Sequence, residues 1–324
     1  HRNPLVFPED ICLNFPLPVS SFAKNWRKQK VSLAEQHHIT YPHFFKPRNS
    51  FEKLYFFLND LYKTPRVNKV VNEYELNSFD IIHYDAGLDF FRYPKQAIKW
   101  KQQGKKIVCC YYGSDLRLRG LIKELDEISD LNITSEFDHL AMKKDLEYIF
   151  YPYSTAELPD RVPNNSSAVK IVHSPTNRKY KGTDLIIKVI EKISKSRTID
   201  FILCEGVPRE ELLRIKAGCD ISIDQVGGTM GGTGYGKAGL ETLGMGIPTI
   251  TNMTEEYRAW LPENPFVVAN NETELETELY RLIDDAAYRE RKGNEGKRWV
   301  DTYHSYESVN KALKELYHRY GITS

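Results

Sequence analysis

Short apolar runs alternate with amphipathic stretches through the second half of the chain. The runs lie at 169–174, 199–205, 219–224, 247–251 and 265–268, and segments with helical spacing of apolar residues stand between them. Strands that are apolar nearly throughout are typical of a parallel sheet covered by helices on both faces. The pattern therefore predicts a doubly wound, Rossmann-like α/β domain.

The first half shows the same alternation. Strand-like runs lie at 11–15, 79–84, 105–112, 131–135 and 147–153, with helix-like patterns between them. A length of 324 residues favours two domains. We expect two Rossmann-like domains that face each other, with ligands at the carboxyl ends of the strands.

A segment rich in Pro, Asn and Ser at 157–168 is the best candidate for a linker. We place an N-terminal domain at 1–165 and a C-terminal domain at 166–304. The last residues, 305–324, are amphipathic, and we expect them to form a helix that packs back on the first domain. The tail from 272 to 320 has the composition of helices.

Composition excludes several classes of protein. A formal net charge of +1 does not fit a nucleic-acid binder, and no apolar run has the length of a membrane span. No secretory signal is visible, and the five cysteines show no metal-binding spacing. We expect a cytoplasmic protein without a metal ion.

One segment leaves a peripheral membrane contact open. In 15–26, which follows the first predicted strand, Phe22 and Trp26 alternate with basic residues. Such a face can touch anionic lipid at the inner face of a membrane, and a solvated helix with core aromatics is the alternative.

The densest chemical signal is a glycine-rich stretch. Nine of the 19 glycines lie in Gly227–Gly246, between a predicted strand and a short predicted helix at 237–245. Glycines let the backbone approach a ligand closely, and the N–H groups of a helix start favour an anion. The stretch predicts a phosphate or diphosphate site; a flexible linker is the alternative, disfavoured inside a strand–helix–strand unit.

A second strand end carries two cations. Arg178 and Lys181 follow the strand that ends near His173, and Gly182 leads into the next helix. Cations at a helix N-terminus oppose the helix dipole unless an anion neutralises them. This favours a phosphate-binding role over a solvated loop.

Two further candidates lie beside these segments. The backbone of Glu205, Gly206 and Val207 follows a third strand and could contact a base, with an ordinary turn as the alternative. Glu241 lies one to two turns into the helix after the glycines, within reach of a ribose. A solvent-facing helix residue is the alternative for Glu241.

The letters GYGKAG at 234–239 also match the dinucleotide fingerprint, with Glu255 and Glu256 about 20 residues further on. The match lies late in the chain, after other strand–helix units, and it leaves the two cations unexplained. A nicotinamide-dependent oxidoreductase is therefore the alternative hypothesis rather than the first.

Taken in order, these segments resemble the retaining glycosyltransferases of family 4, which have the GT-B architecture. The resemblance covers roughly 169–300 and rests on VKIVHSPTN, the two cations with Gly182, ILCEGVPREEL, CDISIDQ and YGKAGLETLGMGIPTI. Glu241 matches the second Glu of the family's paired carboxylates, and Gly246–Pro248 matches its Gly-x-Pro. Thr233 stands where the family has its first Glu. Arg178 precedes Lys181 by fewer residues than the corresponding Arg precedes the Lys in the family.

The resemblance implies roles for these residues. Lys181 and Arg178 would neutralise the departing diphosphate, and Glu241 would hold the ribose. The absence of Asp-x-Asp fits a site that works without a metal. Further donor-binding candidates are Thr233, Gly234, Tyr235, Gly236, Lys237 and Ala238.

In the first half, four polar residues at predicted strand ends are candidates for contact with the acceptor. They are His83, Asp85, Ser114 and Asp115. Buried capping roles are the alternative for each of them.

The leading hypothesis is a glycosyltransferase that uses a UDP- or GDP-linked sugar as co-substrate, with no cofactor. The acceptor would be a glycan, a lipid-linked molecule or a small molecule. Besides the oxidoreductase, a non-catalytic nucleotide-sugar-binding subunit and a sugar-nucleotide isomerase remain as alternatives.

Overall fold

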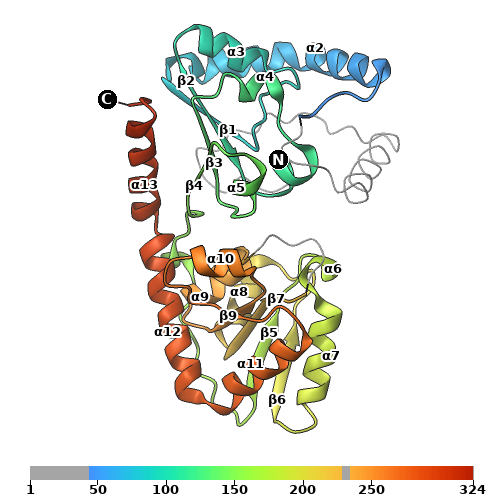
Figure 1. Cartoon of the computed structure of the whole chain (residues 1–324), viewed down its shortest axis with the longest axis vertical. Coiled ribbons are helices and arrows are strands. Elements are labelled where there is room, and N and C mark those ends of the chain that lie inside the picture. The colour runs from blue at the N-terminus through green and yellow to red at the C-terminus, as the bar shows by residue number, and fades with distance from the viewer. Residues whose placement is uncertain (1–43, 228–233, 324) are drawn as a thin grey trace. The chain divides into compact units, whose positions relative to one another are not determined.

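The chain folds into two compact α/β units, each built on one parallel sheet (Figure 1). The structure is a computed structural model, and it describes residues 44–227 and 234–323. The first unit holds the described residues up to Tyr148 and those from Leu316 onward, and the second unit is Ile149–Glu315. The predicted α/β fold class is confirmed in both units.

The first sheet has four parallel strands in the order β1-β2-β3-β4. Five of the six residues of β2 are buried, because helices cover this parallel sheet. The strand predicted at 11–15 lies outside the described residues. The four strands are β1 (Ile81–Asp85), β2 (Lys106–Tyr111), β3 (Leu131–Thr134) and β4 (Leu146–Tyr148).

The helices of the first unit connect these strands and cover the sheet. They are α2 (Ser50–Glu73), α3 (Lys95–Gln102), α4 (Lys123–Asp126) and α5 (His139–Met142). Helix α2 begins after Asn49, whose side chain accepts a hydrogen bond from the Glu52 N–H at 2.9 Å. Trp100 of α3 is buried in the core beneath.

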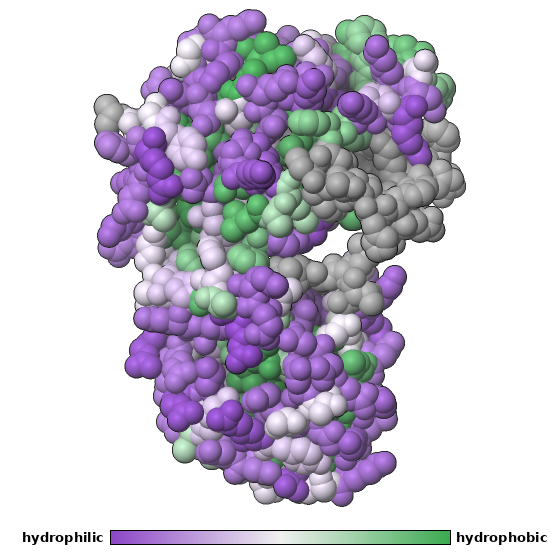
Figure 2. All heavy atoms as spheres, in the orientation of Figure 1, coloured by the Kyte–Doolittle hydropathy of each residue, from purple (hydrophilic) through white to green (hydrophobic). Residues whose placement is uncertain are grey.

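Helix α2 also carries large apolar side chains on its exposed side. Figure 2 shows the corresponding green surface at the upper right of the view. Its exposed large apolar residues are Phe51, Leu54, Tyr55, Phe57, Leu58, Leu61 and Tyr62.

The second sheet has five parallel strands in the order β6-β5-β7-β8-β9. Each overlaps a run that the sequence predicts, because apolar residues of this density can be buried on both faces. The strands are β5 (Val169–His173), β6 (Ile199–Leu203), β7 (Ile221–Gln225), β8 (Thr249–Thr251) and β9 (Val267–Val268).

The helices of the second unit follow the predicted alternation with the strands. Helix α7 shows why, since it buries Ile186, Val189, Ile190 and Ile193 on one face at helical spacing. The helices are α6 (Arg178–Lys181), α7 (Thr183–Ile193), α8 (Arg209–Ala217), α9 (Lys237–Gly244), α10 (Glu255–Trp260), α11 (Glu272–Asp284) and α12 (Ala286–Tyr303).

The units divide at Tyr148 and Ile149, whereas the composition of the chain suggests a boundary at 165. The segment after β4 packs on the second unit instead of linking two domains. The Phe150 ring meets Trp299 edge-on at 5.9 Å between centroids. The Val162 N–H donates to the Ala217 carbonyl at 2.9 Å.

The final helix α13 (Tyr306–Arg319) carries the chain from the second unit into the first. The Tyr317 hydroxyl hydrogen-bonds to His83 at β1, and Arg319 pairs with Glu147 of β4 at 3.1 Å. Among the described helices, none has the length and apolar character that crossing a membrane requires.

Candidate functional site

The carboxyl edge of the second sheet contains a point where the strand order reverses. From β5 the chain moves to β6 on one side and then returns to β7 on the other. The loops after β5 and β7 therefore leave the sheet in opposite directions, which opens a crevice for ligands in doubly wound sheets. The predicted cations follow β5, and the glycine-rich stretch follows β7.

Lys181 reaches across this point of reversal from the end of α6. Gly182 follows it in the left-handed conformation, with φ of 65°, and turns the chain into α7. The Lys181 Nζ donates to Asp224 Oδ1 at 2.6 Å and to Gln225 Oε1 at 3.0 Å. Both acceptors are the last residues of β7, so Lys181 is held against the strand that leads into the glycines.

Asp224 is the buried partner of this lysine. Its side chain is 0% exposed, and its Oδ2 accepts the Gly236 N–H at 2.8 Å. Burial raises the pKa of Asp224, but the charge of Lys181 and the hydrogen bonds outweigh burial and hold this pKa below its usual value. Asp224 is therefore an anion that joins Lys181 to the end of the glycine-rich stretch.

The end of the glycine-rich stretch is fixed by close contacts. A Cβ at Gly234 would stand 2.1 Å from the Tyr257 ring, so only glycine fits there. The Gln225 side-chain amide donates to the Gly234 carbonyl at 2.5 Å. A Cβ at Gly236 would lie 3.4 Å from the Lys181 Nζ, which places the predicted lysine beside the predicted glycines.

Helix α9 begins directly after Gly236. The structure shows no side-chain cap at this helix start. Lys237 is exposed and Ala238 is half-buried in the first turn. An uncapped first turn next to an ammonium group can bind a phosphate through backbone N–H groups and positive charge.

Arg178 and Glu205 form a second, exposed cluster at the same edge. Arg178 pairs with Glu205 at 2.9 Å and with Asp184 at 2.8 Å. These two ion pairs raise the pKa of Arg178, whose charge is permanent in any case. Gly206 and Val207 continue the turn towards α8, so the predicted segments after β5 and β6 do come together.

Glu241 points into the second unit, not into solvent. Its carboxylate pairs with Lys216 at 2.7 Å, and Lys216 is 1% exposed. Arg209, just after the turn at 205–207, lies 3.5 Å from the same carboxylate. The alternative that Glu241 faces solvent is therefore wrong. Its contact with a ribose stays a prediction, and two cations already lie at its carboxylate.

Tyr235 packs into an aromatic cluster. Its ring stacks on Phe266 at 4.7 Å between centroids and meets Trp299 edge-on at 5.5 Å. Its hydroxyl hydrogen-bonds to His304 Nε2 at 3.1 Å. A donor contact at Tyr235 would therefore involve its backbone, because its side chain anchors the glycine-rich stretch.

His304 is neutral and buried in that cluster. Its Nδ1 donates to the Tyr151 carbonyl at 2.6 Å, which leaves Nε2 to accept from Tyr235. Burial lowers the pKa of His304 to about 4.

The four candidates in the first unit lie at the ends of β1 and β2. Asp115 accepts the N–H groups of Tyr112, Gly113 and Leu116 at 2.8–2.9 Å, so its carboxylate is occupied by the backbone of its own loop. Asp85 accepts the Tyr112 hydroxyl at 3.3 Å.

The other two candidates, Ser114 and His83, are both exposed. Ser114 lies next to Asp115, in the loop whose backbone N–H groups Asp115 accepts. His83 hydrogen-bonds to Tyr317 and lies 3.5 Å from the Cys110 sulfur, so its ring is held from two sides. Any acceptor contact by these residues remains a prediction.

Some predicted sites fall outside the described residues. Thr233, Phe22 and Trp26 are among them. Within the described residues, no group of three or more His, Cys, Asp or Glu side chains is placed to hold a metal ion.

Asp224 and Gln225 are the site residues that the sequence analysis missed. A charged and an amide residue end the strand in which Ile221 and Ile223 alternate with Ser222, just before nine clustered glycines. This departure from the apolar pattern is the signal that could have identified them.

Comparison with known proteins identifies the fold. No protein-family model and no curated protein matches the sequence. Among solved structures, HepE of Anabaena in complex with UDP is similar, with a TM-score of 0.56 at 14% identity over 89% of this chain and 88% of that chain. The fold is GT-B.

Two further solved structures are similar to this chain and support the same fold. Sucrose-phosphate synthase from Thermosynechococcus elongatus gives a TM-score of 0.53 at 12% identity over 86% of this chain and 81% of that chain. A glycosyltransferase from Rickettsia africae gives a TM-score of 0.56 at 12% identity over 94% of this chain and 89% of that chain. At such low identity the likeness shows the fold, and the chemistry has to be argued from the site.

Proposed function

We propose that this protein is a glycosyltransferase that takes a sugar from a nucleotide-diphosphate sugar. One observation carries the proposal: Lys181 stands beside Gly236 and the uncapped start of α9, at the reversal point of the second sheet. A diphosphate there would meet an ammonium group and backbone N–H groups together. The similar structure of HepE has been solved with UDP and with UDP-glucose.

Electrostatic stabilisation of the leaving group is the proposed source of catalysis. Negative charge grows on the diphosphate as the bond to the sugar breaks, so groups already fixed in place gain energy in the transition state. Asp224 and Gln225 fix the Lys181 ammonium before any substrate binds. The Arg178 guanidinium lies at the same edge and adds charge.

The finer assignments belong to the same proposal. We expect transfer with retention of configuration, no metal requirement, and an acceptor that is a glycan, a lipid-linked molecule or a small molecule. The retaining family 4 enzymes are the group that the sequence resembles, and the uridine and guanosine diphosphates are the first donors to test.

A thermal-shift screen tests the donor. The full chain would be heated with UDP, GDP, ADP, their sugars and NADH, each with and without EDTA. A ligand at 100 times its Kd should stabilise the protein by about 2.7 kcal/mol. We expect a shift with one nucleoside diphosphate and its sugar that EDTA leaves unchanged.

Two results would contradict the proposal. A shift with NADH alone would favour the oxidoreductase, and a shift that needs Mg²⁺ would show that the leaving-group chemistry is different. Release of nucleoside diphosphate from the stabilising donor then measures turnover, with Lys195→Ala, an exposed lysine of the same unit, as the control variant.

A further inference from the structure

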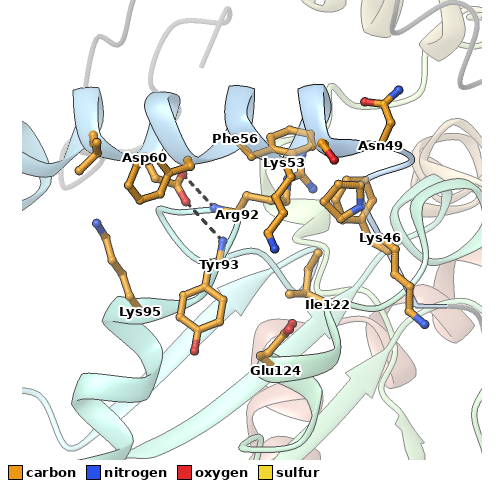
Figure 3. A pocket seen from close by; sticks show the side chains of 15 residues that line it. Lys46, Asn49, Lys53, Phe56, Asp60, Arg92, Tyr93, Lys95, Ile122 and Glu124 are labelled. Carbon is orange, nitrogen blue, oxygen red and sulfur yellow. Dashed lines mark hydrogen bonds between the residues drawn. The ribbon is translucent and has the colours of Figure 1, made fainter.

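A separate pocket lies in the first unit, between α2 and the loops that follow β1 and β2 (Figure 3). Its volume of about 740 Å³ is within the roughly 300–1,000 Å³ typical of small-molecule sites. None of its lining residues is among the candidates of the site described above. Its apolar walls include Phe45, Pro47, Phe56, Phe57, Leu61 and Ile122.

The charged lining is unbalanced in sign. Four cations line the pocket, Lys46, Lys53, Arg92 and Lys95, against two carboxylates, Asp60 and Glu124.

One carboxylate is already used by the protein. Asp60 is 7% exposed, and its oxygens accept the backbone N–H groups of Arg92 at 3.2 Å and Tyr93 at 3.4 Å. These are the dashed bonds of Figure 3. Asp60 therefore holds the loop after β1 against α2 and is not directed at the lysines.

Two of the cations are also engaged within the wall. The Lys95 Nζ donates to the Thr64 hydroxyl at 2.9 Å and lies 4.0 Å from the centre of the Phe91 ring. The Arg92 guanidinium lies over the ring of Phe45 at 4.4 Å. Cations placed over aromatic faces are stabilised there without an acid.

Lys46 and Lys53 differ from Lys95 and Arg92 in their contacts. In the described part of the chain, neither ammonium group forms an ion pair or a hydrogen bond. Figure 3 shows Lys53 extending from α2 into the pocket towards Ile122. Glu124 stands on the opposite wall near Tyr93, and Lys46 extends from the far end of the pocket in a different direction from Lys53. Both flexible lysines would turn towards a ligand that they share.

We propose that this pocket binds a phosphate monoester carried on an apolar body. A lysine ammonium is a compact point charge that suits a phosphate, and two of them can neutralise its dianion. The aromatic and aliphatic walls suit the apolar body, as in most small-molecule sites. The proposal does not depend on the glycosyltransferase activity, because it concerns binding in the first unit alone.

Calorimetry on the full chain tests the proposal with 1-naphthyl phosphate as the probe. Inorganic phosphate and 1-naphthol represent its two halves, and each should bind more weakly than the ester. The Lys46→Gln/Lys53→Gln double variant should weaken binding of the ester by about a hundredfold or more, since two charged hydrogen bonds to the phosphate are lost. Glu124→Gln should strengthen it, because a like charge is removed.

The control variant is Lys69→Gln, an exposed lysine further along α2 that does not line the pocket. Its affinity for the ester should equal that of the wild type. Equal affinity of the double variant and the wild type would overturn the proposal, and so would an equal loss in the control. Titration in saturating UDP should leave the ester affinity unchanged; abolished binding would mean that the probe occupies the nucleotide site.

The apolar wall needs its own test. Phe57 is 59% exposed, so the Phe57→Ser variant should fold normally. It should bind 1-naphthyl phosphate more weakly and bind inorganic phosphate as the wild type does. Vesicles of phosphatidylcholine with and without phosphatidic acid then separate a lipid source from a soluble one. Binding to phosphatidic acid that depends on both lysines, together with no binding of the soluble ester, would replace the pocket with a surface contact.

Discussion

Two lysines in each unit are held in opposite ways. In the second unit, Lys181 and Lys216 pair with the buried carboxylates of Asp224 and Glu241. In the first unit, Lys46 and Lys53 of the pocket are exposed and form no such pairs within the described residues. Removing a charge from water costs several kcal/mol per ion, so a buried lysine needs its acid. An exposed lysine pays no such cost and stays available for a ligand.

This difference separates stability from binding. Substitution of a buried charge should affect folding and function together, because its partner is left uncompensated. Substitution of an exposed charge should affect binding alone. Four measurements test this contrast, in order of expected effect.

The largest effect is expected for Glu241→Ala. The variant leaves Lys216 charged and almost fully buried, and breaking such a pair costs about 3–5 kcal/mol. Denaturant unfolding should show this loss. The Lys216→Met/Glu241→Leu double variant should recover most of it. If the variant unfolds like the wild type and only binds the sugar donor more weakly, Glu241 contributes to ligand binding and not to folding stability.

Lys181→Ala should be next, with about 3 kcal/mol lost from the free energy of unfolding. Asp224 loses its counter-charge but keeps the Gly236 N–H. Turnover should fall on the order of 10²–10³-fold, more than donor binding does. Near-normal turnover in a less stable protein would make Lys181 purely structural.

Acid should destabilise the protein through His304. Its pKa falls from 6.5 to about 4 on folding, so below pH 6.5 the unfolded chain takes up a proton that the folded chain excludes. Stability is complete above pH 6.5, and this residue should remove about 2 kcal/mol between pH 6.5 and 5. His304→Gln should flatten that part of the pH profile. An unchanged profile in the variant would assign the pH dependence to other groups.

The smallest effects on folding are expected for exposed cations in both units. Arg178→Gln and Lys53→Gln should each melt at the wild-type temperature, because their charges are exposed. Arg178→Gln should weaken donor binding, whereas Lys53→Gln should leave it unchanged. A large loss of stability in either variant would break the contrast between buried and exposed cations.

The sequence by itself determined the two parallel sheets and the order of their helices. Burial on both faces makes strands apolar, and one-sided burial gives α7 its helical spacing, so both signals are local in the chain. The same local signals placed Arg178, Lys181 and the glycine-rich stretch at strand ends. The start of α9 at Lys237 agrees with the helix predicted at 237–245.

Only the tertiary structure decided which groups meet at those ends. Lys181 is 43 residues from Asp224, and Glu241 is 25 residues from Lys216, so no local pattern records either pair. The same holds for Tyr235, which the sequence offers as a donor contact and the fold packs against Phe266. Local periodicity reports burial of a face, whereas a buried charge or ring takes its partner from whichever strand or helix packs beside it.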